Sequence, residues 1–524
     1  MLENREAAKI LENIVGSNNF SEDPAIISSY TFHPGGSPSK LEAGKDLFYL
    51  QLGGIIMPGS TEEVQAILKV CNRYRIVYKA LSTGMFAVTG VSLKKGLLRI
   101  DMRRMNKIIK IDDKNMYAVV EPYVTYTRLS VEAMKRGLTC HIIGAGSHTS
   151  PLASVTSGWG HGHSAYTTSH SGRISLGAEW VLPTGEVVKW GLVDEGKAGY
   201  PGPGLSGIYR GAHGAFGALG VFTKVAIKLF PWPGPARLER TGKNPTPGFK
   251  IPDNMKVYLL SLPDAEKLAD AVYKITEAQI AYHLWHHPLF FHPQRWMSTS
   301  NDDYYEIWKK LEAGGIIDKS LNELTVIIAG YSERELKYKE NVLREIINEV
   351  DAKEFLPGFL SNHDMERFFC AEVAVHKPCN EFRLGGGDMG GSWGQILSWD
   401  NQVKPQKAVL KIHTKYIKQG ILNDVAGESC WGGPMEQKAL GHTEYVQFTN
   451  PRNLELRAGQ GKFTEEVLEF AIKEKLLGTG PIAFTRVELE AKASKYQDDY
   501  FDYKKKIKKA LDPNGVSDSS TYVV

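Results

Sequence analysis

Residues 57–90 constrain the fold of this chain more than any other stretch, because they set a helix, a strand and a loop of small residues in sequence. From Val64 to Cys71, apolar side chains recur at i, i+3, i+4 and i+7, the spacing of an amphipathic helix. Ser60 is a natural N-cap for this helix, and Glu63 follows three residues later, as in a capping box. Residues 76–80 then have the composition of a short strand.

The strand leads into a loop of small residues, 81–90, with glycines at 84 and 90. Such a loop lets backbone N–H groups approach a phosphate without obstruction by side chains. It contains neither the G-x-G-x-x-G pattern nor the lysine of a Walker loop, which argues against both of those nucleotide folds. The alternative is an ordinary connection between strands.

Further strands are predicted at residues 97–101, 105–109 and 117–122. The last of them ends at Pro122, which cannot continue a central ladder. A helical pattern then begins near Thr127 and ends at Gly137, a plausible C-cap.

The order of these segments carries a family resemblance. The stretches MPGSTEEV, STGMFAVTG, LRIDMRRMNKIIKID and YAVVEPYVTYTRL resemble the FAD domain of the vanillyl-alcohol-oxidase and p-cresol-methylhydroxylase flavoproteins. Residues 175–191 resemble that family's strand, Thr-Gly turn and strand, and residues 214–233 its glycine-rich stretch and following strand. Residues 503–516 resemble its terminal helix and turn. The first four stretches count as one motif, and the three later segments bring the total to four. Four motifs in this order indicate the fold, although a fold does not specify one reaction.

The resemblance implies an α+β fold, a two-part FAD-binding domain of the PCMH type with an inserted α/β substrate-capping domain. The middle of the chain agrees, since strands alternate there with amphipathic helices at 264–277 and 333–349, which predicts a sheet covered on one side by helices. We expect the first FAD-binding segment at 1–240, the cap at 241–480 and the C-terminal return to the FAD-binding domain at 481–524.

Composition limits the function classes. A formal charge of +4 over 524 residues implies no nucleic-acid or membrane surface. No apolar run approaches the roughly 20 residues that span a bilayer, and the N-terminus lacks the apolar core of a signal peptide. Five scattered cysteines fit a reducing compartment, so we expect a cytoplasmic protein. The expected partner is a small-molecule substrate, and the resemblance implies a homo-oligomer.

Two cofactor segments follow from the resemblance. The loop at 81–90 is implied to hold the diphosphate of FAD, and residues 144–172, with four histidines and six glycines, to run along the flavin ring and ribityl chain. The candidate cofactor-binding residues are Ser82, Thr83, Gly84, Met85, Phe86, Ala87, Gly90, Pro122, Ser150, Ser154, Ser157, Gly158, His161, Gly162, Gly220, Val221 and His442.

Metal binding is not predicted. His161 and His163 form a His-x-His pair, but a pair without further ligands at a fixed spacing is a weak signal. Cys370, His376 and Cys379 also lie close together in the sequence without a fourth ligand at zinc-site spacing.

Residues 441–446 contain His442, which stands where some members of the family attach FAD covalently. His442 is therefore the first candidate for covalent attachment, and the alternative is a histidine that is hydrogen-bonded in the cap. His148 falls where relatives place an acidic residue near the reactive flavin edge. His148 and Tyr445 are candidate catalytic residues.

Arg486 is the third candidate catalytic residue. The family's phenol oxidases bind a phenolate with an arginine and two tyrosines, and here Thr485 and Val88 occupy the places of the tyrosines. The phenolate site is incomplete, but Arg486 could bind a carboxylate, an enolate or a carbonyl. The alternative for Arg486 is a structural ion pair.

The function implied is an FAD-dependent oxidoreductase that moves hydride from an alcohol, or from an activated benzylic or allylic C–H, to flavin N5. The acceptor is either oxygen or an electron-transfer protein. One alternative is a D-2-hydroxy-acid dehydrogenase acting on lactate or glycolate, although the Gly-His-x-x-Asp-Gly-Asn-x-His signature of that branch is missing. Three more functions fit the same fold: a flavin-binding electron-transfer subunit of a complex, a reductase fed by a nicotinamide, and a degenerate binding module.

Overall fold

The computed structural model of the protein covers most of the chain. It describes residues 2–30, 52–84, 94–141, 148–157, 160–194, 205–209, 214–243, 247–316, 322–355, 358–373, 388–397, 399, 403–424, 430–438, 440–450, 453–476, 487–496 and 498–523. Within these ranges, no helix is both long and apolar enough to cross a bilayer.

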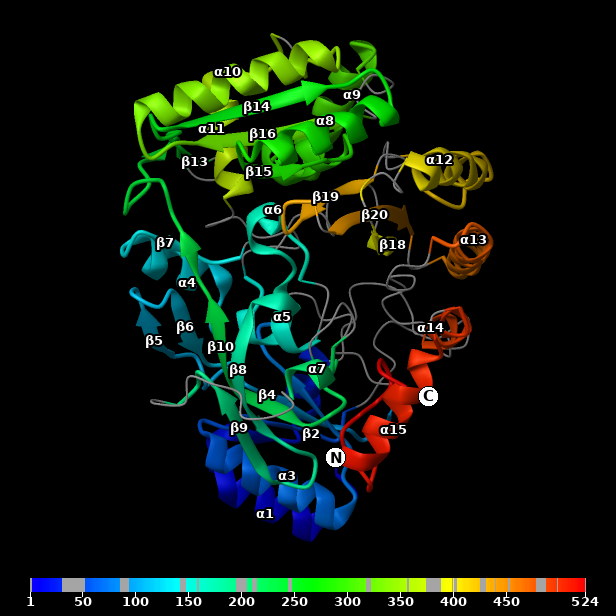
Figure 1. The fold of residues 1–524 in the computed structure, drawn as a ribbon. Coiled ribbons are helices and arrows are strands. Elements are labelled where there is room, and N and C mark those ends of the chain that lie inside the picture. The colour runs from blue at the N-terminus through cyan, green and yellow to red at the C-terminus, as the bar shows by residue number, and fades with distance from the viewer. Residues whose placement is uncertain are drawn as a thin grey trace.

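The first unit of the fold begins with a mixed sheet of order β1-β2-β4-β3, covered by α1 and α3 (Figure 1). The predicted helix is α3, and the Ser60 hydroxyl caps it by accepting a hydrogen bond of 3.2 Å from the N–H of Glu63. The Glu63 carboxylate accepts from the N–H of Gly59 at 2.8 Å, one residue earlier than a capping box requires. The elements are α1 (Arg5–Val15), β1 (Phe20–Ser21), α2 (Pro24–Ser29), β2 (Gly54–Ile56), α3 (Thr61–Tyr74), β3 (Tyr78–Leu81) and β4 (Leu98–Asp101).

The second sheet of this unit is antiparallel, with strand order β5-β6-β10-β8-β9. The Thr-Gly turn predicted between β8 and β9 is present, with Gly185 at a φ of 86°. The third predicted strand begins later than expected, because Met105 turns back to donate a hydrogen bond to the carbonyl of Met102. The elements are β5 (Ile108–Asp112), β6 (Tyr117–Val120), α4 (Tyr126–Met134), β7 (Leu138–Thr139), α5 (Pro151–Ser157), α6 (Ala165–Thr168), β8 (Ser175–Val181), β9 (Val187–Gly191), α7 (Ser206–Tyr209), β10 (Val221–Lys228) and β11 (Phe230–Pro231).

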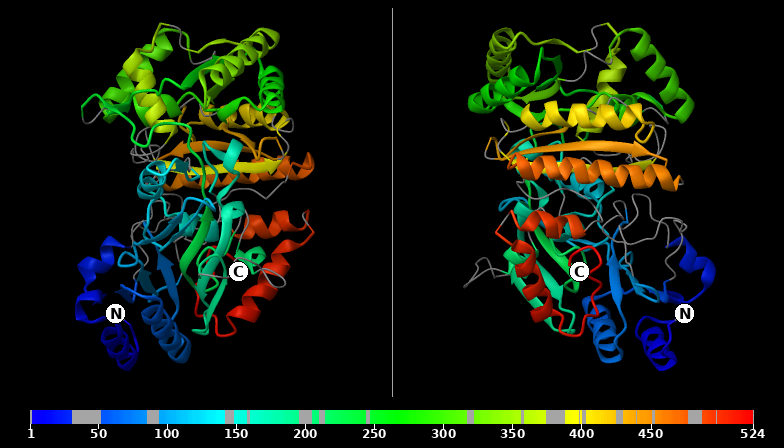
Figure 2. Two further views of the ribbon diagram at one scale, coloured as in Figure 1. Left: turned by 60° about the vertical axis from the view of Figure 1, so that its left-hand side comes forward. Right: turned by 90° about the vertical axis from the view of Figure 1, so that its right-hand side faces the viewer.

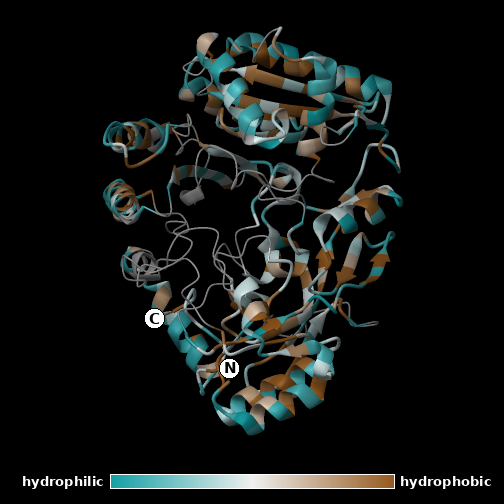
Figure 3. Ribbon diagram, turned by 180° about the vertical axis from the view of Figure 1, so that it is seen from behind, coloured by the Kyte–Doolittle hydropathy of each residue, from teal (hydrophilic) through white to brown (hydrophobic). Residues whose placement is uncertain are grey.

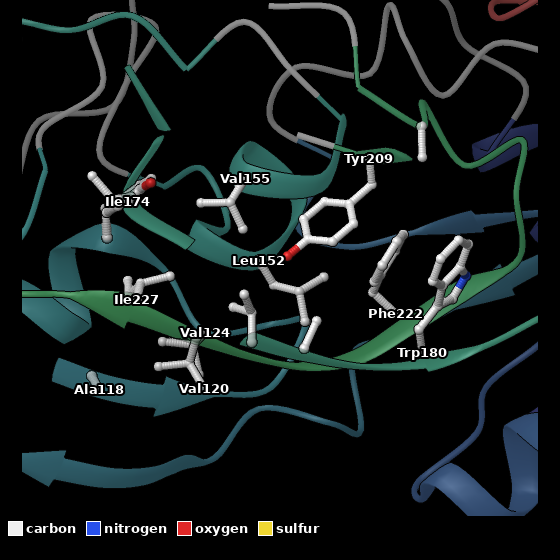
Figure 4. Close-up of a cluster of buried hydrophobic side chains, with 14 of the residues drawn as sticks. Ala118, Val120, Val124, Leu152, Val155, Ile174, Trp180, Tyr209, Phe222 and Ile227 are labelled. Atoms are coloured by element: carbon white, nitrogen blue, oxygen red, sulfur yellow. The ribbon is translucent and has the colours of Figure 1, made fainter. Parts of the chain in front are cut away.

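One face of the antiparallel sheet packs against α5 (Figure 4). Trp180 of β8 and Phe222 of β10 stack with ring centroids 4.8 Å apart, and Tyr209 lies 5.0 Å from Phe222. Leu152 and Val155 of α5 belong to the same cluster, so this core holds α5 against the sheet.

The last residues of the chain return to the first unit. α14 (Val487–Ser494) and α15 (Tyr500–Leu511) lie beside it (Figure 2), and the following segment pairs with β3. Tyr78 donates a backbone hydrogen bond to Val516 at 2.9 Å and accepts one from Asp518 at 2.9 Å. Lys79 forms a buried ion pair with Asp518 at 3.3 Å.

The second unit, the cap, begins with an antiparallel sheet of order β15-β16-β14-β17. Figure 3 shows strands of this sheet in brown, because alternate side chains face α8 and α10 on one side and α11 on the other. The predicted alternation of strands and helices is confirmed. The prediction of helices on one side alone is wrong, because α8 and α10 lie on one face and α11 packs against the other. The elements are β12 (Arg240–Thr241), β13 (Gly248–Phe249), β14 (Met255–Ser261), α8 (Ala265–Ala278), β15 (Ala281–Trp285), α9 (Asn301–Ala313), β16 (Glu323–Ala329), α10 (Glu333–Glu349), β17 (Lys353–Glu354) and α11 (Asn362–Glu372).

A smaller sheet of the cap, of order β18-β20-β19, lies between the larger cap sheet and the first unit (Figure 1). Helices α12 and α13 pack against it (Figure 2). His286 and Gly432 form an isolated bridge that joins the end of β15 to β19. The elements are β18 (Asp388–Leu397), α12 (Val403–Lys418), β19 (Trp431–Met435), β20 (Leu440–Thr449) and α13 (Leu454–Lys473).

Candidate functional site

The two units meet where the histidine-containing segment of the first unit contacts the small cap sheet. His161, from the connection between α5 and α6, stacks on His442 of β20 with ring centroids 4.0 Å apart and planes inclined by 24°. Both side chains are buried. Nε2 of His442 lies 3.4 Å from the Glu444 carboxylate. The structure therefore brings together two candidate cofactor residues separated by almost three hundred positions in the sequence.

The predicted cofactor serines of the same segment lie just before α5 or within it. The Ser150 hydroxyl donates to the carbonyl of Pro122 at 2.6 Å and accepts from the N–H of Ala153 at 3.2 Å, so it ties the start of α5 to the end of β6. Ser154 is buried on α5, and Ser157 is its last residue. Gly162 is buried and accepts a hydrogen bond from the N–H of Ala165. His148 is half-buried just before α5.

The predicted diphosphate loop begins where β3 ends. Ser82, Thr83 and Gly84 are half-buried, and Gly84 has a φ of 69°. β3 runs parallel to β4, so the loop begins at the carboxyl ends of parallel strands, a usual place for ligands in such sheets. Five predicted cofactor residues lie outside the described residues: Met85, Phe86, Ala87, Gly90 and Gly158.

Gly220 and Val221 stand at the start of β10, where packing explains their identity. Gly220 has a φ of 101°, and a Cβ atom there would lie 2.3 Å from the carbonyl oxygen of Val181. Its N–H donates to Oγ of Ser517 at 3.0 Å, which joins the first unit to the C-terminal segment. Val221 is buried in the core beneath α3.

One candidate catalytic residue, Tyr445, is not brought to the junction. Tyr445 is buried on β20 among residues of α12 and α13, on the face of the strand opposite to His442. Burial raises the pKa of its hydroxyl well above the usual value. Arg486, together with Thr485 and Val88, lies outside the described residues, as do His376 and Cys379.

A buried cluster beside the His161–His442 pair was not predicted from the sequence. Three imidazoles surround Oε2 of Glu372, the last residue of α11: Nδ1 of His163 at 3.2 Å, Nε2 of His283 at 2.9 Å and Nε2 of His287 at 3.3 Å. The Arg295 guanidinium lies next to them, with Nη1 3.3 Å from Nε2 of His163. The signal in the sequence is the stretch 283–292, which holds four of the chain's 15 histidines.

The electrostatics of this cluster follow from its burial. Desolvation lowers the pKa of His163 and of His287. Burial alone would raise the pKa of Glu372, but His163 and His287 outweigh it and keep that pKa well below the usual value. The nearby Glu323 differs, because burial raises its pKa well above the usual range. The pKa values of the two buried carboxyl groups at the junction are therefore shifted in opposite directions.

Polar atoms at the junction fit a bound cofactor. Nδ1 of His442 and Oγ of Ser169 are buried and have no hydrogen-bond partner within the part of the chain that the structure describes. Such atoms carry a desolvation cost unless a ligand pairs with them. A protein-family model described as an FAD binding domain matches residues 53–191, which include β2 to β9 and the segment carrying His161.

Solved structures extend the match to the whole chain. A crystal structure of p-cresol methylhydroxylase with substrate bound aligns with a TM-score of 0.73 and 16% identity, covering 98% of this chain and 96% of that one. The 4-ethylphenol oxidase of Gulosibacter chungangensis in an isoeugenol complex aligns with a TM-score of 0.72 and 17% identity, covering 99% and 97%. Residues 53–191 therefore form an FAD binding domain, and the chain has the fold of the PCMH-type flavoproteins. The predicted α+β fold and FAD as its cofactor are thereby confirmed.

Curated relatives of this flavoprotein match over a shorter stretch. The flavoprotein subunit of 4-cresol dehydrogenase (hydroxylating) from Pseudomonas putida is 30% identical over 185 residues, which cover 33% of this chain and 34% of that protein. A probable mitochondrial D-lactate dehydrogenase of Danio rerio is 25% identical over 232 residues, covering 43% of this chain and 41% of that protein. The matched stretch spans between a third and a half of the length of these relatives.

Proposed function

We propose that the protein is an FAD-dependent oxidoreductase that removes hydride from an alcohol, or from an activated benzylic or allylic C–H, of a small molecule. The stacked pair His161–His442 carries the proposal, since it places cofactor candidates of both units at one buried junction. The names of the relatives, which include a cresol dehydrogenase and an ethylphenol oxidase, support the same reaction type.

Bound FAD would supply the hydride acceptor, and the residues of this chain would hold it and orient the substrate. Ser82 to Gly84 would face the diphosphate, while His161 and the adjoining small residues would line the ring. His442 would contact the ring from the cap, through the nitrogen that has no protein partner within the described ranges. His148 and Arg486 remain our candidates for proton transfer and for binding an oxyanion of the substrate.

A second candidate is a D-2-hydroxy-acid dehydrogenase. Its support is that matched relatives are named D-lactate dehydrogenase or glycolate oxidase subunit, among them one from Anaerostipes hadrus and one from Bacillus subtilis. Against it stands the missing histidine signature of that branch. In either case we propose a cytoplasmic homo-oligomer, with a cap at about 241–480, that passes electrons to oxygen or to an electron-transfer protein.

An anaerobic titration separates these candidates. The protein is expressed with excess flavin, and its absorbance spectrum is followed while vanillyl alcohol, cinnamyl alcohol, D-lactate or glycolate is added. Bleaching by the two aromatic alcohols supports the first candidate, and bleaching by the two hydroxy acids supports the second. Air is then admitted, since fast reoxidation marks an oxidase. A protein that binds no flavin even after reconstitution would overturn both.

A further inference from the structure

We propose that His163, His287 and Glu372 bind one divalent transition-metal cation, zinc or ferrous iron, which ties the cap to the FAD-binding unit. One ligand atom from each of the three residues lies within 4.8 Å of the others. The inference goes beyond the proposed flavin chemistry and does not depend on its substrate.

The three residues converge from separate parts of the fold. His163 belongs to the connection between α5 and α6 in the first unit. His287 follows β15, and Glu372 ends α11, so both belong to the cap. A cation held by all three would therefore bridge the two units.

Two of the three distances between ligand atoms match a tetrahedral metal site. Zinc lies about 2.0–2.1 Å from imidazole nitrogen or carboxylate oxygen, which sets tetrahedral ligand atoms about 3.3 Å apart. Nδ1 of His163 lies 3.2 Å and Nε2 of His287 3.3 Å from Oε2 of Glu372. Two imidazoles and one carboxylate form a ligand set used by zinc where the fourth position stays open, and imidazole nitrogens also suit iron.

The hydrogen bonding in the cluster is incomplete without a ligand. All three side chains are fully buried. Although Nδ1 of His163 lies 3.2 Å from Oε2, the two atoms are not aligned for a hydrogen bond, and Oε1 of Glu372 also has no hydrogen-bond partner within the described ranges. Nε2 of His283 lies 2.9 Å from Oε2 but also has no hydrogen-bond partner within the described ranges.

Arg295 sets a condition on binding. Its Nη1 donates to Nε2 of His163 at 3.3 Å only while that nitrogen is unprotonated, which puts the ring proton on Nδ1. A cation at Nδ1 moves the proton to Nε2 and breaks this contact. Arg295 keeps its other anchors, since Nη2 donates to the carbonyl of Ala371 at 3.1 Å and the guanidinium lies over the Phe291 ring. Metal and the His163–Arg295 hydrogen bond therefore exclude each other.

Metal analysis of tag-free protein after exhaustive dialysis tests the proposal. We expect about one zinc or iron per chain, and we expect the chelator-treated protein to bind one Co²⁺ with the visible absorption of a tetrahedral site. His163→Gln, His287→Gln and Glu372→Gln should each reduce Co²⁺ affinity at least tenfold. Arg295→Gln should raise it, because the competing hydrogen bond is gone.

Two matched controls guard against a general loss of structure. Glu323→Gln changes a buried carboxyl group whose oxygens accept from the N–H of His287 and the hydroxyl of Thr325, and whose side chain is not one of the three ligands. It should leave Co²⁺ affinity unchanged. His413→Gln changes a buried histidine on α12, outside the cluster, and should also leave it unchanged. Circular dichroism checks that every variant is folded.

Three results would overturn the proposal. The first is wild-type protein that binds no cation at any concentration while it remains folded. The second is binding that survives all three ligand substitutions, and the third is weaker binding in Arg295→Gln. The last two would mark the cluster as a polar network centred on Glu372, with Arg295 as its counter-ion.

Discussion

The imidazole of His161 lies against that of His442, with ring centroids 4.0 Å apart. This contact joins the FAD-binding unit to the central strand of the small cap sheet. Nε2 of His442 lies near Glu444, while Nδ1 has no hydrogen-bond partner within the described ranges. Only one nitrogen of His442 is therefore available to a ligand.

We predict that FAD is attached covalently through Nδ1 of His442. Acid precipitation of wild-type protein should leave the flavin absorbance in the pellet, whereas His442→Ala should release it to the supernatant. His161→Ala is the matched control, since it removes the stacking partner but keeps the attachment site. Flavin retained in the pellet by His442→Ala would point to another histidine of the chain, and flavin released from wild type would mean non-covalent FAD.

Glu179 on β8 connects several elements of the FAD-binding unit. Its carboxylate accepts hydrogen bonds from the hydroxyls of Thr61 and Thr223 and pairs with Lys189 and Lys224, each at 3.0 Å. Burial alone would raise the pKa of Glu179, but these four partners outweigh it and lower the pKa to about 2.

The depressed pKa predicts how this contribution depends on pH. The stabilisation is present above the ordinary glutamate pKa near 4.5 and is lost as the pH falls from there towards 2. Glu179→Gln should therefore lower the free energy of unfolding by about 2 kcal/mol at pH 7, and the difference from wild type should shrink below pH 4. Urea denaturation at several pH values measures this. Glu306→Gln, which breaks an exposed pair with Lys309, should leave the free energy of unfolding close to that of wild type at every pH. A Glu179→Gln effect that does not change with pH would contradict the assignment.

Local sequence patterns predicted most of the elements. The cap of α3 at Ser60, the hairpin at Gly185 and helices α8 and α10 could be found because each depends on residues close together in the chain. The start of β5 was misplaced because a local turn at Met105 competes with an apolar strand pattern. The family resemblance correctly implied FAD and the fold, which no spacing of residues could establish.

The candidate site was less accessible from sequence. Residues 283–292 are rich in histidine, but only the tertiary fold brings His163 and Glu372 to them from distant positions. The orientation of Tyr445 depends on which face of β20 meets α12 and α13, and the sequence does not state which face that is. Gly220 stays a predicted cofactor residue, and the structure adds a packing role against Val181 that the sequence did not indicate.

Gly220 provides a direct test of that packing role. Gly220→Ala places a methyl group 2.3 Å from a carbonyl oxygen at a φ of 101°, so both a clash and backbone strain oppose it. We expect it to lower the free energy of unfolding by more than about 3 kcal/mol. Gly315→Ala is the control, since its φ of 61° is also positive but nothing lies within 4 Å of the added atom. It should cost about 1 kcal/mol. Thermal unfolding at saturating FAD compares them, and equal costs would argue against the clash.

The buried pair Lys79–Asp518 holds the C-terminal segment on β3. Nζ of Lys79 lies 3.3 Å from the carboxylate and donates to the Thr521 hydroxyl at 2.8 Å. Burial would raise the pKa of Asp518, but Lys79 outweighs it and lowers the pKa, so the pair is ionised. Removing one partner leaves an uncompensated buried charge, which costs about 3–5 kcal/mol.

We therefore expect Asp518→Asn to destabilise the protein by that amount and to make residues after α15 accessible to protease. Lys79→Met should cost a similar amount, because the buried carboxylate loses the cation that forms its ion pair. The double variant should recover more than half of the summed loss, because neither member of the ion pair is left buried without the other. Urea unfolding of wild type, the two single variants and the double variant gives the coupling free energy of the pair. Limited proteolysis with mass spectrometry locates the released segment. Strictly additive losses would show that the two charges contribute independently, and cleavage elsewhere would show that the pair does not hold the C-terminal segment.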